Sequence, residues 1–271
     1  MDSLRVAALQ MVSTPRVDDN LAAAERLIGA AAREGAALVA LPEYFCLMGL
    51  GERDKLGVAE PFGGGRIQAM LAGAAHAHGV WIVGGTLPIS SADPGHVYNA
   101  CLAFAPDGRC VARYDKLHLF RFVDGRDDFD ERRVLHEGES TAAFDAGDWR
   151  VGLSVCYDLR FPELYRALTR ERPCDLLAVP SAFTVTTGRA HWEVLLRARA
   201  IENQAYVIAP AQGGTHESGR RTWGHSVVVD PWGELIALRE EGEGIVLATL
   251  ERSRLDAVRS QLPALAHRRL G

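Results

Sequence analysis

The sequence contains no apolar run long enough to cross a membrane. A membrane-spanning helix needs about 20 consecutive apolar residues, and the apolar segments here are much shorter. The N-terminus also lacks a charged region followed by an apolar one, which is the pattern of a secretory signal. These absences predict a protein that is neither inserted in a membrane nor exported, and we expect it in the cytoplasm.

Cysteine pairs and metal-binding motifs are also missing. The five cysteines, at positions 46, 101, 110, 156 and 174, form no C-x-x-C pair, and their odd number argues against a disulfide framework. No H-E-x-x-H motif occurs, and His76 and His78 would lie on nearly opposite faces of a helix. The glycines 63–65 lack the following Lys-Ser/Thr of a phosphate-binding loop. We therefore expect reduced thiols, no metal and no cofactor.

Basic residues are not gathered into a stripe. The chain has 30 Lys and Arg against 35 Asp and Glu, a net charge of −5 and a pI near 6.0. Because nucleic-acid-binding proteins usually present clustered positive charge, we expect no nucleic-acid partner. A chain of 271 residues, 48% of them hydrophobic, can bury a large core. We expect residues 1–271 to form a single domain.

Short apolar segments alternate with amphipathic ones, which predicts an α/β protein. Strand-like segments are found at 4–12, 37–41, 80–87, 98–104, 110–114, 151–155, 174–180, 205–209, 224–229, 235–238 and 244–250. Helical patterns follow residues 18, 67 and 162, and a helix over 190–203 has Trp192, Leu195, Leu196 and Ile201 as its expected buried residues. A turn at 106–108 joins two strands into a hairpin, so the sheet is mixed. The pattern favours a sandwich of sheets covered by helices.

Residues 121–140 form a charged stretch in which the sequence indicates no helix or strand. Loops of this length without elements of their own are uncommon and often functional. We predict that this stretch forms a lid or a wall of a site.

Three polar residues stand directly after predicted strands: Glu43, Lys116 and Cys156. Taken singly, each has an ordinary interpretation, as a loop acid, a surface lysine and a small buried residue. Together they supply a base, a cation and a thiol at strand ends, where α/β sheets place their chemistry. We interpret Glu43 as the proton acceptor, Lys116 as the cation that favours the thiolate and stabilises an oxyanion, and Cys156 as the nucleophile. A Cys–His pair through His118 or His225 is the alternative, but neither histidine follows a strand so directly.

The segment after Cys156 suits the first turn of a helix, because a Pro-Glu pair follows at positions 162 and 163. Cys156 therefore lies at a strand-to-helix corner, where the next peptide N–H groups can bind a developing negative charge. We expect the backbone N–H of Tyr157 to serve as an oxyanion donor beside Lys116.

Three separated motifs carry a resemblance to a known family: Leu41–Glu43, Asp115–Leu119 and Val155–Glu163. In this order they resemble the nitrilase, or carbon–nitrogen hydrolase, superfamily. The resemblance implies a four-layer αββα sandwich and a Glu-Lys-Cys triad formed by Glu43, Lys116 and Cys156.

The resemblance also implies a second glutamate, placed after the lysine and beside the nucleophile. Glu131 matches that position, and Glu137 and Glu139 are close enough in sequence to remain alternatives. A glutamate in this place would orient Lys116 and could assist proton transfer.

Later segments, 186–203, 223–226 and 229–233, resemble the Nit branch of the superfamily. This branch includes deaminated glutathione amidases and omega-amidases. The resemblance implies an amidase that acts on a small carboxylated amide, deaminated glutathione or an α-keto acid ω-amide, through a cysteine thioester, with release of ammonia. Arg189 departs from the proline expected there. Relatives commonly form homodimers or larger homo-oligomers, so a homo-oligomer is implied as well.

Three further residues are candidates for substrate binding. The planar guanidinium of Arg160 could hold a substrate carboxylate, or it could pair with Glu163 or Asp158 to brace the corner. Phe183 and Thr187 lie on a predicted loop after the next strand, where they could line the pocket; the alternative for Phe183 is a plain core position.

Other functions remain open at this point. Within the same enzyme class, the sequence allows an N-carbamoyl-amino-acid amidohydrolase or a nitrilase. Outside it, the chain could be a catalytically idle relative that acts as an interaction protein, although the intact set of Glu43, Lys116 and Cys156 argues against that.

Overall fold

The computed structural model describes residues 2–123 and 128–269, and it contains two large sheets. The strands of the first are β1 (Ser3–Gln10), β2 (Leu38–Ala40), β3 (Trp81–Val83), β4 (Leu87–Ser90), β5 (Val97–Phe104), β6 (Cys110–Asp115), β9 (Leu135–His136) and β18 (Gly244–Glu251). The strands of the second are β10 (Ala142–Ala146), β11 (Trp149–Leu153), β12 (Leu176–Ala178), β13 (Tyr206–Ala209), β16 (Ser226–Val229) and β17 (Leu235–Arg239). Two small ribbons pair β7 (Arg121–Val123) with β8 (Asp128–Asp130), and β14 (Gly213–Thr215) with β15 (Arg221–Trp223).

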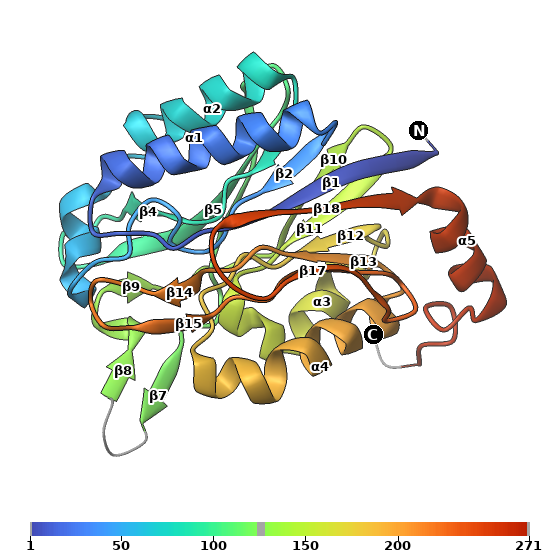
Figure 1. Cartoon of the computed structure of the whole chain (residues 1–271). Helices are drawn as coiled ribbons and strands as arrows, with labels where there is room; N and C mark the ends of the chain where they lie inside the picture. The colour runs from blue at the N-terminus through green and yellow to red at the C-terminus, as the bar shows by residue number, and fades with distance from the viewer. Residues whose placement is uncertain (1, 124–127, 270–271) are drawn as a thin grey trace.

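The helices are α1 (Val17–Arg33), α2 (Arg66–His78), α3 (Pro162–Leu168), α4 (Val185–Asn203) and α5 (Arg252–Gln261), with 3₁₀ turns η1 (Glu52–Val58), η2 (Glu131–Arg133) and η3 (Cys156–Arg160). Figure 1 shows α1 and α2 over the outer face of the first sheet, and α3 and α4 over the outer face of the second. The two sheets face each other between these helical layers. The predicted αββα sandwich is confirmed.

Both sheets are mixed. The first runs β18-β1-β2-β3-β5-β4, in which β1, β2 and β3 are parallel and the flanking strands are antiparallel. The second runs β10-β11-β12-β13-β16-β17, with β11, β12 and β13 parallel. The parallel strands end at the same edge of their sheet, and the chain segments that follow β2 and β11 begin there.

Alternation of side chains along the strands sorts the core into layers. In β1, Val6 and Ala8 pack between the sheets, whereas Ala7 and Leu9 belong to the cluster that includes α1 and α2. Successive side chains of a strand point to opposite faces, so a strand buried on both sides is apolar throughout. This is why the central strands read as continuous apolar runs and could be located in the sequence.

Several predicted boundaries are wrong, among them three on segments that lead to the candidate site. The expected strand 80–87 is two strands, β3 and β4, because Gly85 adopts a φ of 56° between them. The expected strand 151–155 is β11, which ends at Leu153. Helix α4 begins at Val185 instead of 190, because the Thr184 hydroxyl caps it by accepting a hydrogen bond from the Thr187 N–H.

The stretch 121–140 does contain elements, contrary to the prediction. It includes β7, β8, η2 and β9, and β9 pairs in parallel with β5. Residues 124–127 of this stretch lie outside the described residues. Ile201 was expected to be buried in α4 but is 50% exposed, while Trp192 and Leu196 are buried as predicted. Within the described residues, no helix combines the length and the apolar character needed to cross a membrane.

Candidate active site

Cys156 lies where the chain leaves β11 and turns into η3 and α3. Its φ is 49°, a left-handed conformation that costs free energy for a residue with a side chain and is concentrated at functional sites. The Cys156 N–H donates to the Pro180 carbonyl at 2.9 Å, which ties the corner to the end of the neighbouring β12. In the described part of the chain, no acceptor receives a hydrogen bond from the Tyr157 N–H. The corner therefore offers a thiol and an unused donor side by side.

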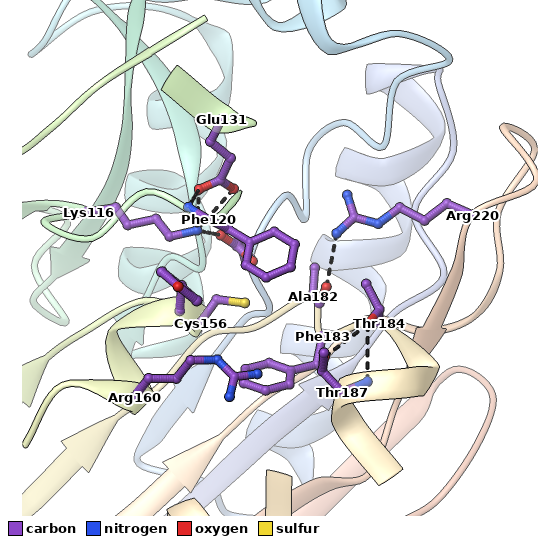
Figure 2. Close-up of a pocket in the computed structure, with 12 residues that line it drawn as sticks. Lys116, Phe120, Glu131, Cys156, Arg160, Ala182, Phe183, Thr184, Thr187 and Arg220 are labelled. Carbon is purple, nitrogen blue, oxygen red and sulfur yellow. Dashed lines mark hydrogen bonds and ion pairs between the residues drawn. The ribbon is translucent and has the colours of Figure 1, made fainter. Parts of the chain in front are cut away.

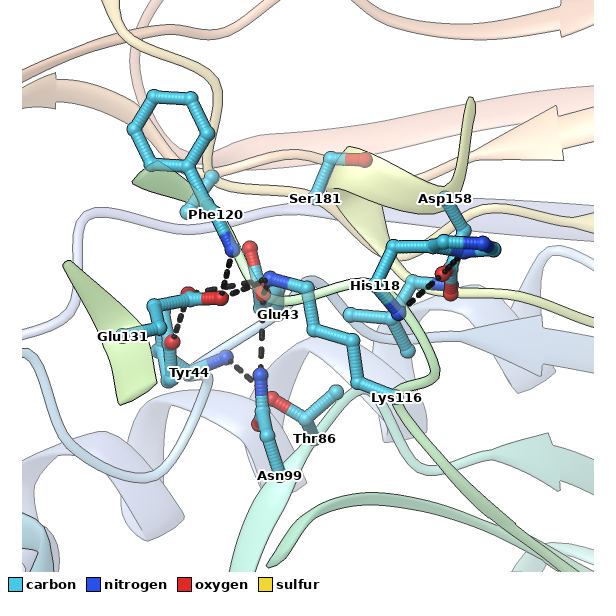
Figure 3. A network of polar contacts seen from close by, with 12 residues as sticks. Glu43, Tyr44, Thr86, Asn99, Lys116, His118, Phe120, Glu131, Asp158 and Ser181 are labelled. Carbon is cyan, nitrogen blue, oxygen red and sulfur yellow. Dashed lines mark hydrogen bonds and ion pairs between the residues drawn. The ribbon is translucent and has the colours of Figure 1, made fainter. Parts of the chain in front are cut away.

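Glu43, Lys116 and Glu131 form a buried charge cluster beside this thiol (Figure 3). The Lys116 Nζ donates to Glu43 Oε1 at 2.9 Å and to the two Glu131 oxygens at 3.0 and 2.8 Å. Each of these side chains is at most 4% exposed. Glu137 and Glu139, the alternatives for the second glutamate, are exposed to solvent. The structure thus brings Glu131 to Lys116 and leaves the other two outside.

Close backbone packing positions Glu43 and Lys116. A side chain on Gly85 would place its Cβ 2.2 Å from the Pro42 carbonyl oxygen, so only glycine fits beside the residue that precedes Glu43. A side chain on Gly138 would approach the Asp115 carbonyl oxygen to 2.0 Å, and the Gly138 N–H donates to the Lys116 carbonyl at 2.9 Å. These two glycines let neighbouring segments lie directly against the strand ends that carry the cluster.

Two neighbours of the cluster were not predicted to contact its carboxylates. Asn99, on β5, donates its side-chain amide to Glu43 Oε1 at 3.0 Å. The Tyr44 hydroxyl donates to Glu131 Oε1 at 2.6 Å, although the sequence connected Tyr44 with no role. Both residues fix the direction of a carboxylate. Asn99 adjoins Tyr98 in an otherwise apolar strand. The only local signal for its contact with Glu43 was its polar side chain within an apolar segment.

The charge states within the cluster follow from burial and from mutual contact. Burial by itself would lower the pKa of Lys116, but Glu131 and Glu43 outweigh it and raise that pKa above the ordinary value. Burial likewise opposes ionisation of Glu131, but Lys116 and the Tyr44 hydroxyl together hold the pKa of this carboxyl below its usual range. At neutral pH the cluster therefore contains an ammonium ion and an ionised Glu131.

The pKa of the Cys156 thiol is raised well above its ordinary value. Burial is the main cause and the negative charge of Glu43 adds to it, while Lys116 and a hydrogen bond from the Ala182 backbone act in the opposite direction. Glu43 lines the same pocket as the thiol. The resting site therefore holds a neutral thiol beside a carboxylate, so a base must remove the proton as the sulfur attacks.

This raised pKa makes a prediction for chemical labelling. The rate at which iodoacetamide alkylates Cys156 should keep rising above about pH 8.5, the ordinary thiol pKa, because only the thiolate reacts. Replacement of Glu43 by glutamine removes a charge that raises the thiol pKa, so labelling of this variant at neutral pH should be faster. The measurement is the mass increase of the Cys156 peptide with time. A plateau below pH 8 in the unmodified enzyme would contradict the assignment.

Asp158 connects the segment of Lys116 with the corner of Cys156. It is fully buried, and its carboxylate accepts hydrogen bonds from the Val155 N–H at 2.8 Å, the His118 N–H at 3.1 Å and the Tyr114 hydroxyl at 2.7 Å. The His118 ring lies 2.7 Å from the same carboxylate. His118 therefore acts in this brace and does not contact the thiol as a catalytic partner.

Replacement of Asp158 by alanine is expected to lower the free energy of unfolding by about 3 kcal/mol. Several buried donors would lose their acceptor, and each buried donor left without a partner costs about 1–3 kcal/mol. Water that enters the cavity left by the carboxylate would replace some of these hydrogen bonds and reduce the total. Urea unfolding monitored by circular dichroism would measure the change. The matched control is Asp107→Ala in an exposed turn, which should leave stability nearly unaltered. A loss no larger than that of the control would contradict the role of Asp158.

A small pocket opens over the thiol (Figure 2). Its lining includes Glu43, Lys116, Glu131 and Cys156, and all of the predicted binding residues, Arg160, Phe183 and Thr187. The pocket has a volume of about 20 Å³. The pocket therefore has room for a small group only.

Arg160 is placed to bind an anion. Within the described chain no carboxylate lies within 4 Å of its guanidinium, so the alternative pairings with Glu163 and Asp158 do not form. The guanidinium lies 5.4 Å from the centre of the Phe183 ring and contacts His191 Nδ1 at 3.2 Å. Phe183 is buried against Trp192 and also forms the pocket floor, so both of its interpretations apply.

Arg220 is a lining residue that the sequence reasoning missed. It follows a short turn after β14, and its guanidinium donates to the Ala182 carbonyl at 3.1 Å at the pocket mouth. Only the paired arginines at 220 and 221 marked this segment in the sequence, and nothing local indicated that it folds over the strand ends. The structure thus adds a second arginine to the site.

The fold and the site define a class of protein. A buried thiol, a carboxylate that accepts its proton, an ammonium ion and a free backbone N–H can together attack a carbonyl carbon and hold the resulting oxyanion. The sequence matches the carbon–nitrogen hydrolase family over residues 5–260, and the chain belongs to that family.

Relatives with known names are similar over nearly the whole chain. A deaminated glutathione amidase of Synechocystis sp. is 44% identical over 266 residues, with 97% of each chain covered. Omega-amidase NIT2 of Homo sapiens is 38% identical over 270 residues, covering 99% of this chain and 96% of that one. These relatives and the family show that the chain is an amidase, an enzyme that hydrolyses amides.

Solved structures show the same fold. The NitFhit protein of C. elegans superposes with a TM-score of 0.92 and 38% identity, covering 99% of this chain and 66% of that one. Nit3 of Saccharomyces cerevisiae is described as a member of branch 10 of the nitrilase superfamily. It superposes with a TM-score of 0.90 and 31% identity, covering 99% of this chain and 97% of that one. The resemblance to the nitrilase superfamily and its Nit branch is confirmed.

Proposed function

We propose that the enzyme hydrolyses a small carboxylated amide through a thioester on Cys156, with deaminated glutathione as the favoured substrate and an α-keto acid ω-amide as the second. The observation that supports this most directly is the grouping of the buried Cys156 thiol with Glu43 and Lys116 in one pocket, beside a free N–H. The names of the relatives supply the substrate class.

In the first half of the reaction, Glu43 takes the thiol proton as Cys156 attacks the amide carbon. The oxyanion that forms is held by the Lys116 ammonium and the Tyr157 N–H. As the C–N bond breaks, Glu43 returns the proton to the departing nitrogen, and the acyl group stays on the sulfur as a thioester. The leaving group is ammonia from a primary amide, and it is cysteinylglycine from deaminated glutathione.

In the second half, water replaces the amine. The water oxygen attacks the thioester carbon while Glu43 accepts a proton from the water. The Lys116 ammonium and the Tyr157 N–H hold the second oxyanion, as they held the first. Collapse of this intermediate breaks the C–S bond and returns the proton to the sulfur. Glu131 and Tyr44 act through Lys116, whose ammonium they hold toward Glu43.

Arg160 is proposed to bind the carboxylate of the acyl half, with Phe183 and Thr187 as the surrounding wall. Support comes from the pocket, which these residues line, and from the absence of any carboxylate partner for Arg160 among the described residues. A bidentate guanidinium–carboxylate pair fits a planar keto acid.

A substrate panel tests this function. Deaminated glutathione, α-ketoglutaramate, an N-carbamoyl amino acid and an aliphatic nitrile would each be incubated with the enzyme and with its Cys156→Ala variant. The first two should release 2-oxoglutarate, and the last two would be followed by ammonia. Release from neither of the first two, with turnover of a carbamoyl compound or a nitrile, would replace the proposed substrate class by one of those alternatives.

We further propose a single domain, a cytoplasmic location and a homo-oligomeric enzyme. The family match over residues 5–260 supports the single domain. Val194 and Ile201 on α4 are 67% and 50% exposed. Trp232 is 49% exposed, and the next residue, Gly233, packs against Ile201. Exposed apolar side chains that are grouped in this way are typical of subunit contacts. Light scattering during gel filtration would give the mass, and a monomer would exclude the homo-oligomer.

A further inference from the structure

A second and much larger cavity adjoins the small pocket. The two share Phe120, Thr184 and Arg220, so they meet at these residues. The outer cavity has a volume of about 850 Å³, against about 20 Å³ for the pocket at the thiol. The inner pocket cannot contain both halves of an extended amide. One half must therefore lie in the outer cavity while the bond to be broken lies at Cys156.

Among the residues that the structure describes, the lining of the outer cavity carries more positive than negative charge. Lys55, Arg220 and Arg221 line it, with Glu52 as the single acidic residue among its lining side chains in the described chain. Aromatic rings, Phe122 and Phe129 together with the shared Phe120, form another part of its wall. A cavity of this composition suits an organic anion with an apolar portion.

Two of these cations have no anionic partner in the part of the chain that the structure describes. The Arg220 guanidinium donates to the Ala182 carbonyl and lies 5.2 Å from the centre of the Phe129 ring, and the Lys55 ammonium lies 4.8 Å from the centre of the Tyr44 ring. Among the described residues, no carboxylate comes within 4 Å of either cation. Burial lowers the pKa of Lys55, and the negative charges of Glu131 and Glu43 offset this effect only in part.

The two pocket arginines enter from different sides of the thiol. Figure 2 shows Arg160 against Phe183 on one side of the Cys156 sulfur and Arg220 near Ala182 on another. A carboxylate on the acyl half can therefore bind at Arg160 while a carboxylate on the amine half binds at Arg220. Arg160 and Arg220 would then each recognise one end of the substrate, independently of the other.

We propose that the outer cavity is the binding site for the amine half of the substrate, and that Arg220, assisted by Lys55, pairs with a carboxylate on that half. The inference rests on the proposed amidase function and narrows it. The preferred substrates are secondary amides whose departing amine is itself an anion, such as the cysteinylglycine half of deaminated glutathione. A primary amide leaves the outer cavity empty and gains nothing from Arg220.

Three substrates with the same 2-oxoglutaryl acyl half test this site. They are deaminated glutathione, its analogue with the C-terminal carboxylate converted to an amide, and α-ketoglutaramate, each followed by release of 2-oxoglutarate. With the unmodified enzyme, kcat/KM for deaminated glutathione should exceed that for the neutral analogue by roughly 30-fold, the size expected for a charge-assisted pair.

Arg220→Gln should remove this preference. Its kcat/KM should fall roughly 30-fold for deaminated glutathione, mainly through KM, and by less than about threefold for the other two substrates. Lys55→Met should show the same pattern with a smaller loss. Arg189→Gln is the matched control, since Arg189 is an exposed arginine outside both cavities, and it should change none of the three.

The outcomes separate this inference from the proposed function. If the unmodified enzyme releases 2-oxoglutarate from none of the substrates, the proposed function fails. If it acts on them but does not distinguish the carboxylate from the amide, or if Arg220→Gln lowers all three equally while the protein remains folded, the inference fails and the function stands. If Arg220→Gln does not fold, the preference of the unmodified enzyme decides, and its absence overturns the inference.

Discussion

Replacement of Cys156 by alanine is expected to lower kcat/KM by at least roughly 10⁴-fold, because the variant has no atom that can form the thioester. Cys156 is the one cysteine among the described residues that line the pocket, and Glu43 lines the pocket with it. The fold should survive, because the change removes only one sulfur atom from the wall of the pocket and leaves the packing elsewhere unchanged. Release of 2-oxoglutarate measures the activity, and circular dichroism measures the fold.

Two controls make the Cys156 result specific. Cys110→Ala removes an exposed thiol that is distant in sequence from Cys156, and it should leave activity unchanged. Cys156→Ser retains the shape of the site but replaces the thiol with a hydroxyl, which is a far weaker nucleophile and should also be nearly inactive. Activity within about tenfold of the unmodified enzyme in either Cys156 variant would show that another group attacks the amide.

Replacement of Lys116 by methionine should be almost as damaging. The ammonium is one of two proposed oxyanion donors, and loss of one such donor costs about 3 kcal/mol, or roughly 10²–10³ in kcat. The same change leaves Glu43 and Glu131 buried beside each other without the cation that joins them. One of the two carboxylates would then take up a proton at neutral pH, which also disables the base. A fall in kcat of roughly 10³-fold or more is expected.

Stability should fall together with activity in Lys116→Met, and a second change separates the two. Removing one member of a buried charge cluster typically costs about 3–5 kcal/mol, less any relief from protonation. The double variant Lys116→Met with Glu131→Gln no longer buries two adjacent carboxylates, so it should recover part of the free energy of unfolding and none of the activity. Recovery of activity in the double variant would contradict the assignment of Lys116 as an oxyanion donor.

The catalytic candidates could be predicted from the sequence because each follows a strand directly. Glu43 and Cys156 come at the ends of apolar runs long enough to be recognised as buried strands, and parallel strands end at a common edge. The superfamily resemblance then indicated Glu131 and left Glu137 and Glu139 as alternatives. The structure agrees in placing Glu131 on Lys116.

The supporting residues could not be predicted in the same way. Asn99 reaches Glu43 only because β5 pairs with β4 and β6 in a particular register, which the sequence of β5 alone does not specify. Arg220 reaches the pocket because a segment after β14 folds back over the ends of strands in the second sheet. Such contacts depend on tertiary structure. The early start of α4 was missed for a local reason: Val and Thr are weak helix formers, and the cap at Thr184 compensates for them.

The account is tested most directly by mass spectrometry of the enzyme quenched in acid during turnover. α-Ketoglutaramate and deaminated glutathione differ in their amine halves but share one acyl half, so both should add the same 2-oxoglutaryl mass to the peptide that contains Cys156. Glu43→Gln should show little of this adduct from either amide, since the thiol proton has no acceptor. Steady turnover without an adduct at Cys156, or adducts of different mass from the two substrates, would contradict the thioester mechanism.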